Sequence, residues 1–367
     1  MDSKPTWSKV ITNSERGKAD CPHKFFLGTA LGLVPDSAAE PLYKGNLFHK
    51  IMEEADENGA ETAIRMHRDR RDSHLDAVGP EFMRAPRERI RTLFHDLDWL
   101  ARAYFSFWGK SSDWDWEVLE SEQRHTYPVT GDVHLGGIQD KLVRFNGQLW
   151  IVDHKTTKGD ASQWYDNSYS AQGPAYVWMV SNSIGERVAG IIYDVANSKP
   201  IEWEPIPLKK PPGVRKHGPP HLTANMYAEA LEKHGIGIDW KEWTLDNHQA
   251  LRDREDAGYW FSRIPVPFSD EEIERARLEW TVVAAGLSAI KVKHEPHRDW
   301  IAGIDDPWEQ ADAISSVAQE FGWHYPRAFG QCKKWGRMCA YREFCERPQD
   351  GPNGLVFRPK RKEYEDL

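Results

Sequence analysis

Two short apolar runs joined by Asn146-Gly147 constrain the fold of this chain more than any other feature. The runs are GGIQDKLVRF and QLWIVDHKTT, and both have the composition of β-strands. Asn-Gly favours a two-residue type I′ turn, because both central positions of that turn need positive φ. The turn fixes the register, and counting back from it sets Asp140 opposite Asp153. The sequence therefore predicts a β-hairpin in which two carboxylates face one another.

These two aspartates lie where a strand is normally apolar. Like charges opposite one another destabilise a sheet, and a buried carboxylate is costly unless it is paired or bound to a metal. Lys155 follows Asp153 by two residues and, by strand alternation, points to the same face. We expect the two carboxylates to hold an oxygen-seeking ion such as Mg²⁺ or Mn²⁺, with Lys155 beside a bound water. The alternative is that Asp140 is solvated and that Asp153 pairs with Lys155 or Lys141.

Composition places the chain among globular proteins. Of 367 residues, 40% are apolar and 29% are charged, which suits one large or two ordinary domains with a substantial core. The net charge of -9 argues against a basic coat for nucleic acid, although it leaves room for a local basic groove. The sequence has no run of 18 apolar residues and no apolar signal-peptide core. We expect a cytoplasmic protein without a membrane partner, a setting in which disulfides are rare.

The chain changes character along its length, and we expect it to divide accordingly. Residues 1–110 are mainly helical in pattern, 111–205 carry the strand-like runs, 206–220 are basic and proline-rich, 221–330 are helical, 331–350 hold three cysteines and 351–367 are polar. Ser269 stands three residues before Glu272, a capping-box signature that opens one of the later helices. The sequence has no Walker-type phosphate loop, so an ATP motor is not encoded here.

The hairpin resembles the core of the PD-(D/E)XK nucleases, particularly their RecB-like branch. Gly137 stands three residues before Asp140, as in that family, and Asp153 with Lys155 matches its aspartate-x-lysine motif on the next strand. The resemblance implies an α/β fold with a restriction-endonuclease-like core, in which helices flank a central mixed sheet. It also implies helical insertions around that core.

Two further motifs of the RecB-like branch occur in the family's order. His49 lies in a helix-like segment upstream, and Gln172 with Tyr176 matches a downstream Gln-x-x-x-Tyr helix. A helix histidine is more often satisfied by its neighbours than a ligand, and a pair four residues apart lies on one face of any amphipathic helix. The resemblance implies the catalytic set His49, Asp140, Asp153, Lys155, Gln172 and Tyr176. It implies a metal held by Asp140, Asp153, His49 and the carbonyl of His154.

The four cysteines are split between the two ends of the chain. Cys21 lies near the start, and Cys332, Cys339 and Cys345 lie near the end. In a reducing compartment such a set can close a metal site that ties the ends together. The layout resembles the four-cysteine [4Fe-4S] clamp of AddB-type helicase-nucleases and CRISPR-associated exonucleases. Structural zinc and unligated buried thiols are the alternatives.

Together these features predict a metal-dependent DNA nuclease, most directly an exonuclease that acts on single-stranded DNA or on free DNA ends. The resemblance implies a role in recombination, repair or CRISPR-adaptation-like processing, with a helicase or another protein as partner. An endonuclease, a non-catalytic DNA-binding subunit and a metal-clamped scaffold without a nucleic-acid role are the alternatives. Candidate phosphate-binding groups are Lys209, Lys210, Arg215, Lys216, Lys333, Lys334 and Arg337.

Overall fold

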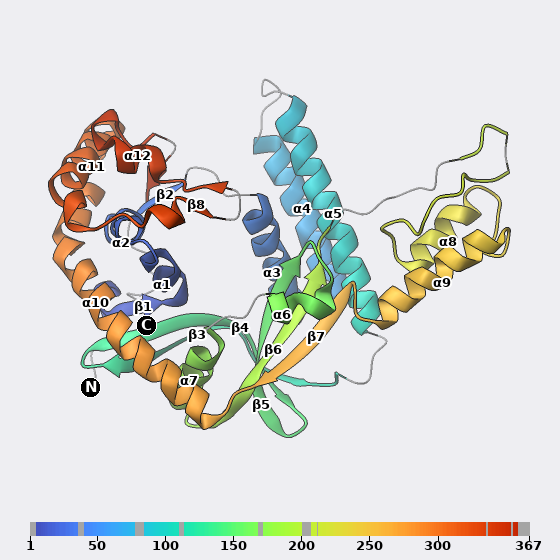
Figure 1. The fold of residues 1–367 in the computed structure, drawn as a ribbon, viewed down its shortest axis with the longest axis horizontal. Coiled ribbons are helices and arrows are strands. Elements are labelled where there is room, and N and C mark those ends of the chain that lie inside the picture. The colour runs from blue at the N-terminus through green and yellow to red at the C-terminus, as the bar shows by residue number, and fades with distance from the viewer. Residues whose placement is uncertain are drawn as a thin grey trace.

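A mixed six-stranded sheet runs through the middle of the molecule (Figure 1). The computed structural model describes residues 5–35, 40–77, 84–109, 114–167, 172–199, 207–210, 212–334, 337–353 and 355–358. The strands of the sheet are β1 (Val10–Thr12), β3 (Glu117–Thr130), β4 (Val133–Phe145), β5 (Gln148–Thr157), β6 (Val188–Asn197) and β7 (Phe261–Pro267). Their order is β1-β4-β5-β6-β7, and β3 also pairs with β4. The expected α/β fold with a central mixed sheet is confirmed.

Pairing within the sheet explains the apolar run before Asp153. Strand β5 lies between β4, with which it is antiparallel, and β6, with which it is parallel. A strand covered on both faces reads as a continuous apolar run and not as an alternation. Ile151 and Val152 accordingly are 1% and 0% exposed, although their side chains point to opposite faces.

The hairpin between β4 and β5 has the predicted turn and register. Asn146 and Gly147 have φ of 50° and 75°, the left-handed values that a type I′ turn requires. The ladder runs from the Phe145–Gln148 pair to the Lys141–Val152 pair without a shift. It ends there, one pair before Asp140 and Asp153, so these two aspartates stand where the strands begin to separate.

Helices cover both faces of the sheet. The longer ones are α3 (Glu40–Asn58), α4 (Ala60–Ala77), α5 (Arg84–Trp108), α7 (Gln172–Ile184), α8 (Ala224–Glu232), α9 (Glu242–Asp256), α10 (Asp270–Ala302) and α11 (Pro307–Phe321). The short ones are α1 (Asn13–Ala19), α2 (Pro22–Phe25), α6 (Trp164–Asn167) and α12 (Arg342–Glu346). The capping box predicted at Ser269 is present and starts α10. Among the described residues, no helix combines the length and the apolar character that crossing a bilayer requires.

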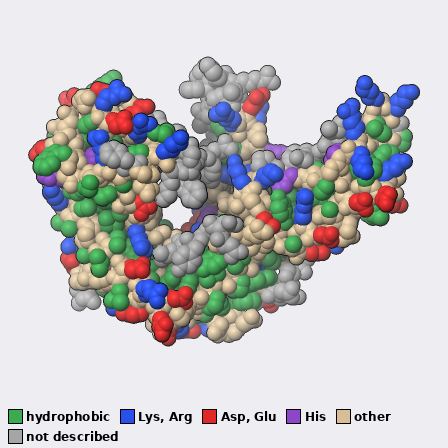
Figure 2. All heavy atoms as spheres, in the orientation of Figure 1, with side chains coloured by type: hydrophobic (Ala, Val, Ile, Leu, Met, Phe, Trp, Pro, Cys, Tyr) green, Lys and Arg blue, Asp and Glu red, His purple; other side chains and the backbone are tan. Residues whose placement is uncertain are grey.

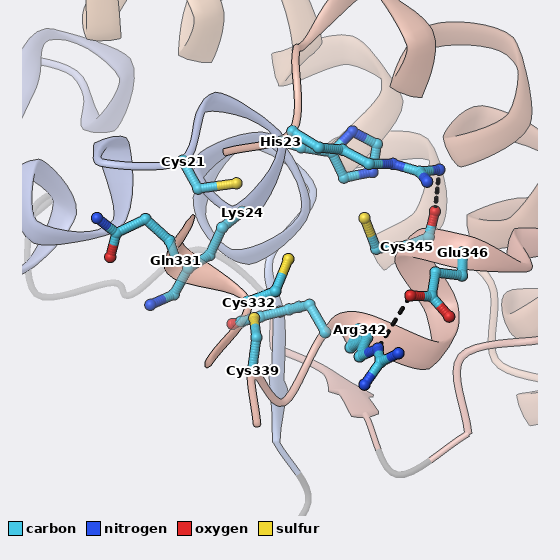
Figure 3. A pocket seen from close by; sticks show the side chains of 11 residues that line it. Cys21, His23, Lys24, Gln331, Cys332, Cys339, Arg342, Cys345 and Glu346 are labelled. Carbon is cyan, nitrogen blue, oxygen red and sulfur yellow. Dashed lines mark hydrogen bonds and ion pairs between the residues drawn. The ribbon is translucent and has the colours of Figure 1, made fainter. Parts of the chain in front are cut away.

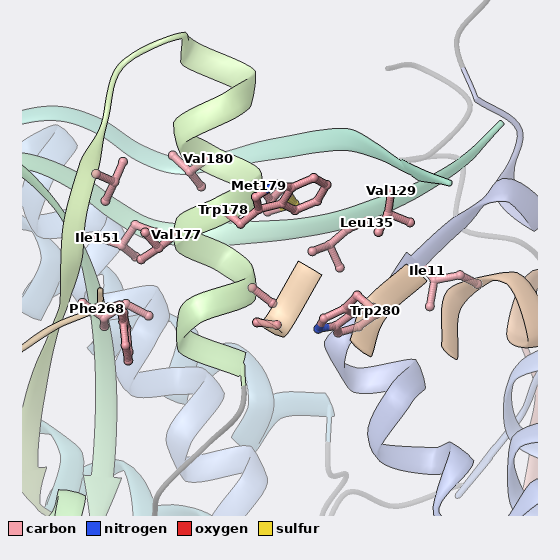
Figure 4. Packing of buried hydrophobic residues seen from close by; sticks show 14 of the residues in the cluster. Ile11, Val129, Leu135, Ile151, Val177, Trp178, Met179, Val180, Phe268 and Trp280 are labelled. Carbon is pink, nitrogen blue, oxygen red and sulfur yellow. The ribbon is translucent and has the colours of Figure 1, made fainter. Parts of the chain in front are cut away.

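The main core lies between the sheet, α7 and α10 (Figure 4). Val177 and Val180 of α7 pack there with Ile151 of β5, and Trp280 of α10 is fully buried. A fully buried apolar side chain contributes about 1.5–3 kcal/mol by leaving water. This layer therefore fixes β5, and with it the strand that carries Asp153, from one side.

The opposite face of the sheet is covered by α3 and α5. Phe48 of α3 is fully buried, and its ring lies 5.8 Å from that of Tyr104 on α5. The same ring lies 6.5 Å from the imidazole of His154 on β5. Because Phe48 is locked in this layer, the next residue along α3, His49, is placed at the rim of the sheet.

Both ends of the chain meet in a second packing unit, which we call the terminal unit; its described residues lie in 21–35 and 301–358. The short strands β2 (Leu33–Pro35) and β10 (Leu355–Phe357) pair antiparallel there. Apolar residues of the π-helix Phe26–Ala30, of α11 and of α12 form one cluster around them. A two-residue hairpin, β8 (Lys333–Lys334) with β9 (Arg337–Met338), lies beside it. Figure 1 shows this unit on one side of the sheet and α8 with α9 on the other.

Candidate active site

Asp140 is the point at which helix α3 meets the hairpin. Its Oδ1 lies 3.2 Å from Nδ1 of His49, and its Oδ2 accepts a hydrogen bond of 2.6 Å from the backbone N–H of His154. Burial alone raises the pKa of Asp140, but the hydrogen bond and the charge of His49 outweigh it and lower that pKa to about 2. The side chain is only 13% exposed. Asp140 is therefore an ionised, buried carboxylate and not a solvated end of the hairpin.

His49 responds to the same contact in the opposite direction. Burial lowers the pKa of the imidazole, but the hydrogen bond and the charge of Asp140 outweigh it, so the net pKa of His49 is raised. A proton on Nδ1 competes with any metal ion for that nitrogen. Metal binding at this position is therefore expected to release a proton.

Asp153 and Lys155 form an ion pair next to Asp140. Lys155 Nζ lies 2.6 Å from Asp153 Oδ1, as expected for two residues on the same face of one strand. Burial lowers the pKa of Lys155, but Asp153 outweighs it and the net pKa is raised. Burial raises the pKa of Asp153, an effect that Lys155 only partly offsets. Lys155 thus stays cationic beside the carboxylates.

Lys141 has a different partner. Its Nζ lies 2.8 Å from Oδ1 of Asp56 on α3, so it does not compete for Asp153. Asp140 and Lys141 are consecutive, yet both bond to α3. Strict alternation would have placed Asp140 on the face of Leu142, which packs in the core on the α7 side. Asp140 and Lys141 therefore both contact α3 at the point where the β4–β5 ladder ends.

Glu122 of β3 belongs to this group as well, and sequence reasoning missed it. The pairs Ser121–Lys141 and Gln123–Gln139 bracket it, which puts it opposite Asp140. His49, Glu122 and Asp140 each offer one ligand atom, and these atoms lie within 4.8 Å of one another. Burial, followed by the charges of Asp140 and Glu53, raises the pKa of Glu122 to about 7.

The Gln-x-x-x-Tyr motif lies at the start of α7, on the other side of β4. A Cβ on Gly137 would lie 2.9 Å from the ring of Tyr176, so this glycine is needed for the tyrosine to approach the strand. Gln172 Oε1 accepts a hydrogen bond of 2.9 Å from Asn13 Nδ2 on α1. The two motif residues thus contact β4 and α1, and their catalytic roles stay predictions.

A buried polar layer lies beneath the hairpin. Asp194 of β6 is fully buried; Tyr104 donates a hydrogen bond to it, and Arg263 Nε lies 3.3 Å from its Oδ2. The His154 ring faces this layer, with Nδ1 at 3.5 Å from Asp194 Oδ2. Burial is the main cause that holds the pKa of His154 well below its usual value. The neutral His154 side chain thus faces the layer, and its backbone N–H contacts Asp140.

Arg263 is held by aromatic rings. Its guanidinium carbon lies 4.0 Å from the ring centroid of Trp108 and 3.9 Å from that of Trp116. Cation–π contacts of this kind suit a partly desolvated arginine. The guanidinium is therefore fixed against Asp194, and this fixes the strand that neighbours Asp153.

The four cysteines converge on one pocket of the terminal unit (Figure 3). Cys21 precedes α2, Cys345 lies on α12, and the backbone N–H of Cys339 bonds to the carbonyl of Cys332 at 2.8 Å. All four thiols are free. Burial is the main cause that raises the pKa of Cys345 to about 11; the charge of Arg327 opposes it, and the other three thiols contribute to it. Four sulfurs that face one space are a donor set for a metal or an iron-sulfur cluster.

No match was found among curated proteins. A family model described as the PD-(D/E)XK nuclease superfamily matches residues 17–346. This match spans the hairpin, helix α3, helix α7 and all four cysteines. The chain therefore belongs to the PD-(D/E)XK nuclease superfamily.

Proposed function

We propose that this protein is a metal-dependent DNA exonuclease of the RecB-like branch. One observation carries the proposal: the His49–Asp140 contact and the Asp153–Lys155 ion pair lie next to each other at the point where β4 and β5 separate. Carboxylates, an imidazole and a lysine are the groups that phosphodiester hydrolysis with a divalent ion requires. Family membership gives the reaction class, and the RecB-like motifs support the choice of branch.

The residues present fit a divalent cation. Asp140 is ionised, His49 turns a nitrogen toward it, and Asp153 and the carbonyl of His154 are the further expected ligands. A bound divalent ion supplies polarisation of the scissile phosphate and a lower pKa for water. Asp140 and Asp153 bring the two negative charges that favour binding of such an ion.

Lys155 has the second role. Its ion pair with Asp153 holds Nζ in place and keeps it protonated. A fixed cation beside the scissile phosphate stabilises the negative charge that develops on the phosphorus oxygens in the transition state. The same ammonium group orients the attacking water.

Binding of the DNA backbone is proposed to use basic side chains on both arms of the molecule. Figure 2 shows Lys and Arg side chains gathered along the upper edges of the terminal unit and of the α8–α9 region. Lys209, Lys210, Arg215 and Lys216 are exposed beside α8, and Lys333 is exposed in the terminal unit; the side chains of Lys334 and Arg337 lie outside the described residues. Affinity for DNA is expected to fall steeply with salt.

The cysteine site is proposed to hold a structural [4Fe-4S] cluster without a redox step in catalysis. The proposal rests on the RecB-like layout and on the convergence of Cys21, Cys332, Cys339 and Cys345 in one pocket. Anaerobic purification followed by iron, sulfide and zinc analysis tests it. We expect close to four irons and four sulfides per chain, and one zinc without iron would overturn the cluster.

Digestion of end-labelled linear DNA against closed circular DNA, with Mg²⁺ or Mn²⁺, tests the proposed activity. We expect the linear DNA to be degraded and the circular DNA to stay intact. Asp153→Ala should abolish degradation of the linear DNA. Asp246→Ala, an exposed position on α9, is the matched control and should retain activity. Cutting of the circular substrate would show an endonuclease. Binding of DNA without cleavage, by protein with a filled cysteine site, would instead show a DNA-binding subunit of a helicase or CRISPR-adaptation complex.

A further inference from the structure

Three separate elements each bring one possible metal ligand to the region around Asp140, which we call the cation site. His49 comes from α3, Glu122 from β3 and Asp140 from β4, and their ligand atoms lie within 4.8 Å of one another. Ligand atoms around an ion with bonds of about 2.1 Å are roughly 3–4 Å apart. A small closing movement of these side chains is therefore enough to surround an ion.

The surroundings of Glu122 lack the partner that a half-buried carboxylate needs. Within the described part of the chain, no hydrogen bond or ion pair reaches its carboxylate; of the charges around it, Asp140 and Glu53 raise its pKa, and His49 and Lys50 only partly offset them. A carboxylate held among carboxylates is unfavourable unless a cation offsets the charge. Lys155 does not supply this charge, because its ammonium group is bound to Asp153.

The backbone of Glu122 has an unusual conformation at the position where its side chain approaches Asp140. Its φ is 50°, and it is one of two non-glycine residues with positive φ among the described residues. The other, Asn146, lies in the hairpin turn, where positive φ is required. Glu122 does not lie in a turn, and its neighbours Ser121 and Gln123 pair regularly with β4. The unusual φ belongs to the residue whose carboxylate reaches Asp140.

We propose that Glu122 is a ligand of the divalent cation, together with His49 and Asp140. This inference rests on the proposed function, because it concerns the same ion. One imidazole with two carboxylates suits Mn²⁺ better than Mg²⁺, since imidazole is a good ligand for transition metals and Mg²⁺ takes oxygen donors.

Binding of Mn²⁺ without DNA tests the role of Glu122. The full chain with a filled cysteine site is titrated with Mn²⁺, and free Mn²⁺ is measured by electron paramagnetic resonance. We expect Glu122→Gln to weaken Mn²⁺ binding roughly tenfold or more. Glu117→Gln, an exposed position on the same strand, should bind as the wild type does. Equal Mn²⁺ affinity in the wild type and in Glu122→Gln would overturn the proposal.

Thermal unfolding separates a lost ligand from a damaged fold. Without metal, Glu122→Gln should unfold at or above the wild-type temperature, because it removes a charge beside Asp140 and Glu53. Added Mn²⁺ should raise the unfolding temperature of the wild type more than that of the variant. A variant that unfolds well below the wild type without metal would show a structural role for Glu122 and overturn the proposal.

The two proposals fail in different ways. Unchanged Mn²⁺ binding by Glu122→Gln, together with DNA cleavage that depends on Asp153, would remove Glu122 from the ligand set and leave the nuclease proposal standing. Glu122-dependent Mn²⁺ binding without cleavage of any DNA would support the ligand role of Glu122 and remove the exonuclease.

Discussion

The cation site and the cysteine site are assembled in opposite ways. In the cation site, Asp140 already has His49 and a backbone N–H, and Asp153 already has Lys155. In the cysteine site, four thiols line one pocket, and burial, with a smaller contribution from the other thiols, raises the pKa of Cys345 to about 11 against the charge of Arg327. We therefore expect the first site to keep its shape without an ion, and the second to depend on the group that it is proposed to bind.

The cation site is also packed on both sides by large elements, whereas the cysteine site is surrounded by short ones. The hairpin is fixed by the core with α7 on one face and by the Asp194 layer on the other. The terminal unit is joined by short strands, β2 with β10, and by helices of four to fifteen residues around its cysteines. Loss of an ion should thus affect chemistry in the sheet and stability in the terminal unit.

The largest effect is expected for Asp140→Asn. The amide oxygen still accepts the N–H of His154, so the fold should unfold within a few degrees of the wild type. The lost charge removes the main cation ligand, and DNA cleavage should fall roughly a thousandfold. Cleavage assays and thermal unfolding measure the two effects. A large loss of stability would show that the cation site depends on the charge of Asp140 for its shape, and would contradict the expectation that this site keeps its shape without an ion.

The second effect concerns Cys345→Ser. The variant should lose the bound metal or cluster, and the terminal unit should loosen while the sheet stays folded, since ligand binding and folding are coupled there. Hydrogen exchange should rise for amides of α12 and β10 and stay low for β5 and β6. Asp246→Ala, an exposed position on α9, gives the control. Unchanged exchange in the terminal unit would show that its apolar cluster suffices.

The hairpin register was predictable because a two-residue turn fixes which residues pair on either side of it. Asn146-Gly147 allows two central residues with positive φ, and the ladder then follows by counting to the Lys141–Val152 pair. His49 was predictable only by resemblance, since its position depends on Phe48 of the same helix. The strand β1 was missed because its three residues are too short to show a pattern.

Glu122 could not be found by the same counting. The turn before β4 pairs Thr130 with Val133, and counting from it sets Glu122 opposite Lys141. An irregularity between Pro128 and Thr130 shifts the register by one residue and brings Glu122 opposite Asp140. A bulge adds a residue that no local sequence rule places reliably, and a shift of one residue turns every side chain to the other face.

The third effect tests the support beneath the hairpin. Asp194→Asn leaves Arg263 buried without its charged partner and weakens the hydrogen bond from Tyr104. Removal of one member of a buried ion pair typically costs about 3–5 kcal/mol. Urea unfolding should show this loss without any change in the cysteine site. A loss below about 1 kcal/mol would mean that the rings around Arg263 hold the layer without Asp194.

The smallest effect concerns pH and lies where α10 packs against the terminal unit. His294 is fully buried and its Nε2 lies 2.7 Å from the hydroxyl of Tyr325. Burial, followed by the charges of His297, Lys293 and His324, lowers the pKa of His294 to about 4. In the unfolded chain the imidazole has its ordinary pKa of about 6.5. The unfolded state therefore binds the proton first, and stability is lost as pH falls from about 6.5 to about 4.

His294→Gln keeps a partner for Tyr325 and cannot take up this proton. Between pH 7.5 and pH 4.5 the wild type should lose about 1–3 kcal/mol more than this variant in the free energy of unfolding measured with urea. His95→Gln, exposed on α5, should follow the wild type. Equal pH dependence of the wild type and His294→Gln would show that the acid sensitivity of the terminal unit comes from the cysteine site alone. That result would sharpen the difference between the two sites. The stability of the terminal unit would then depend on the cysteine site, whereas the stability around the cation site depends on packing.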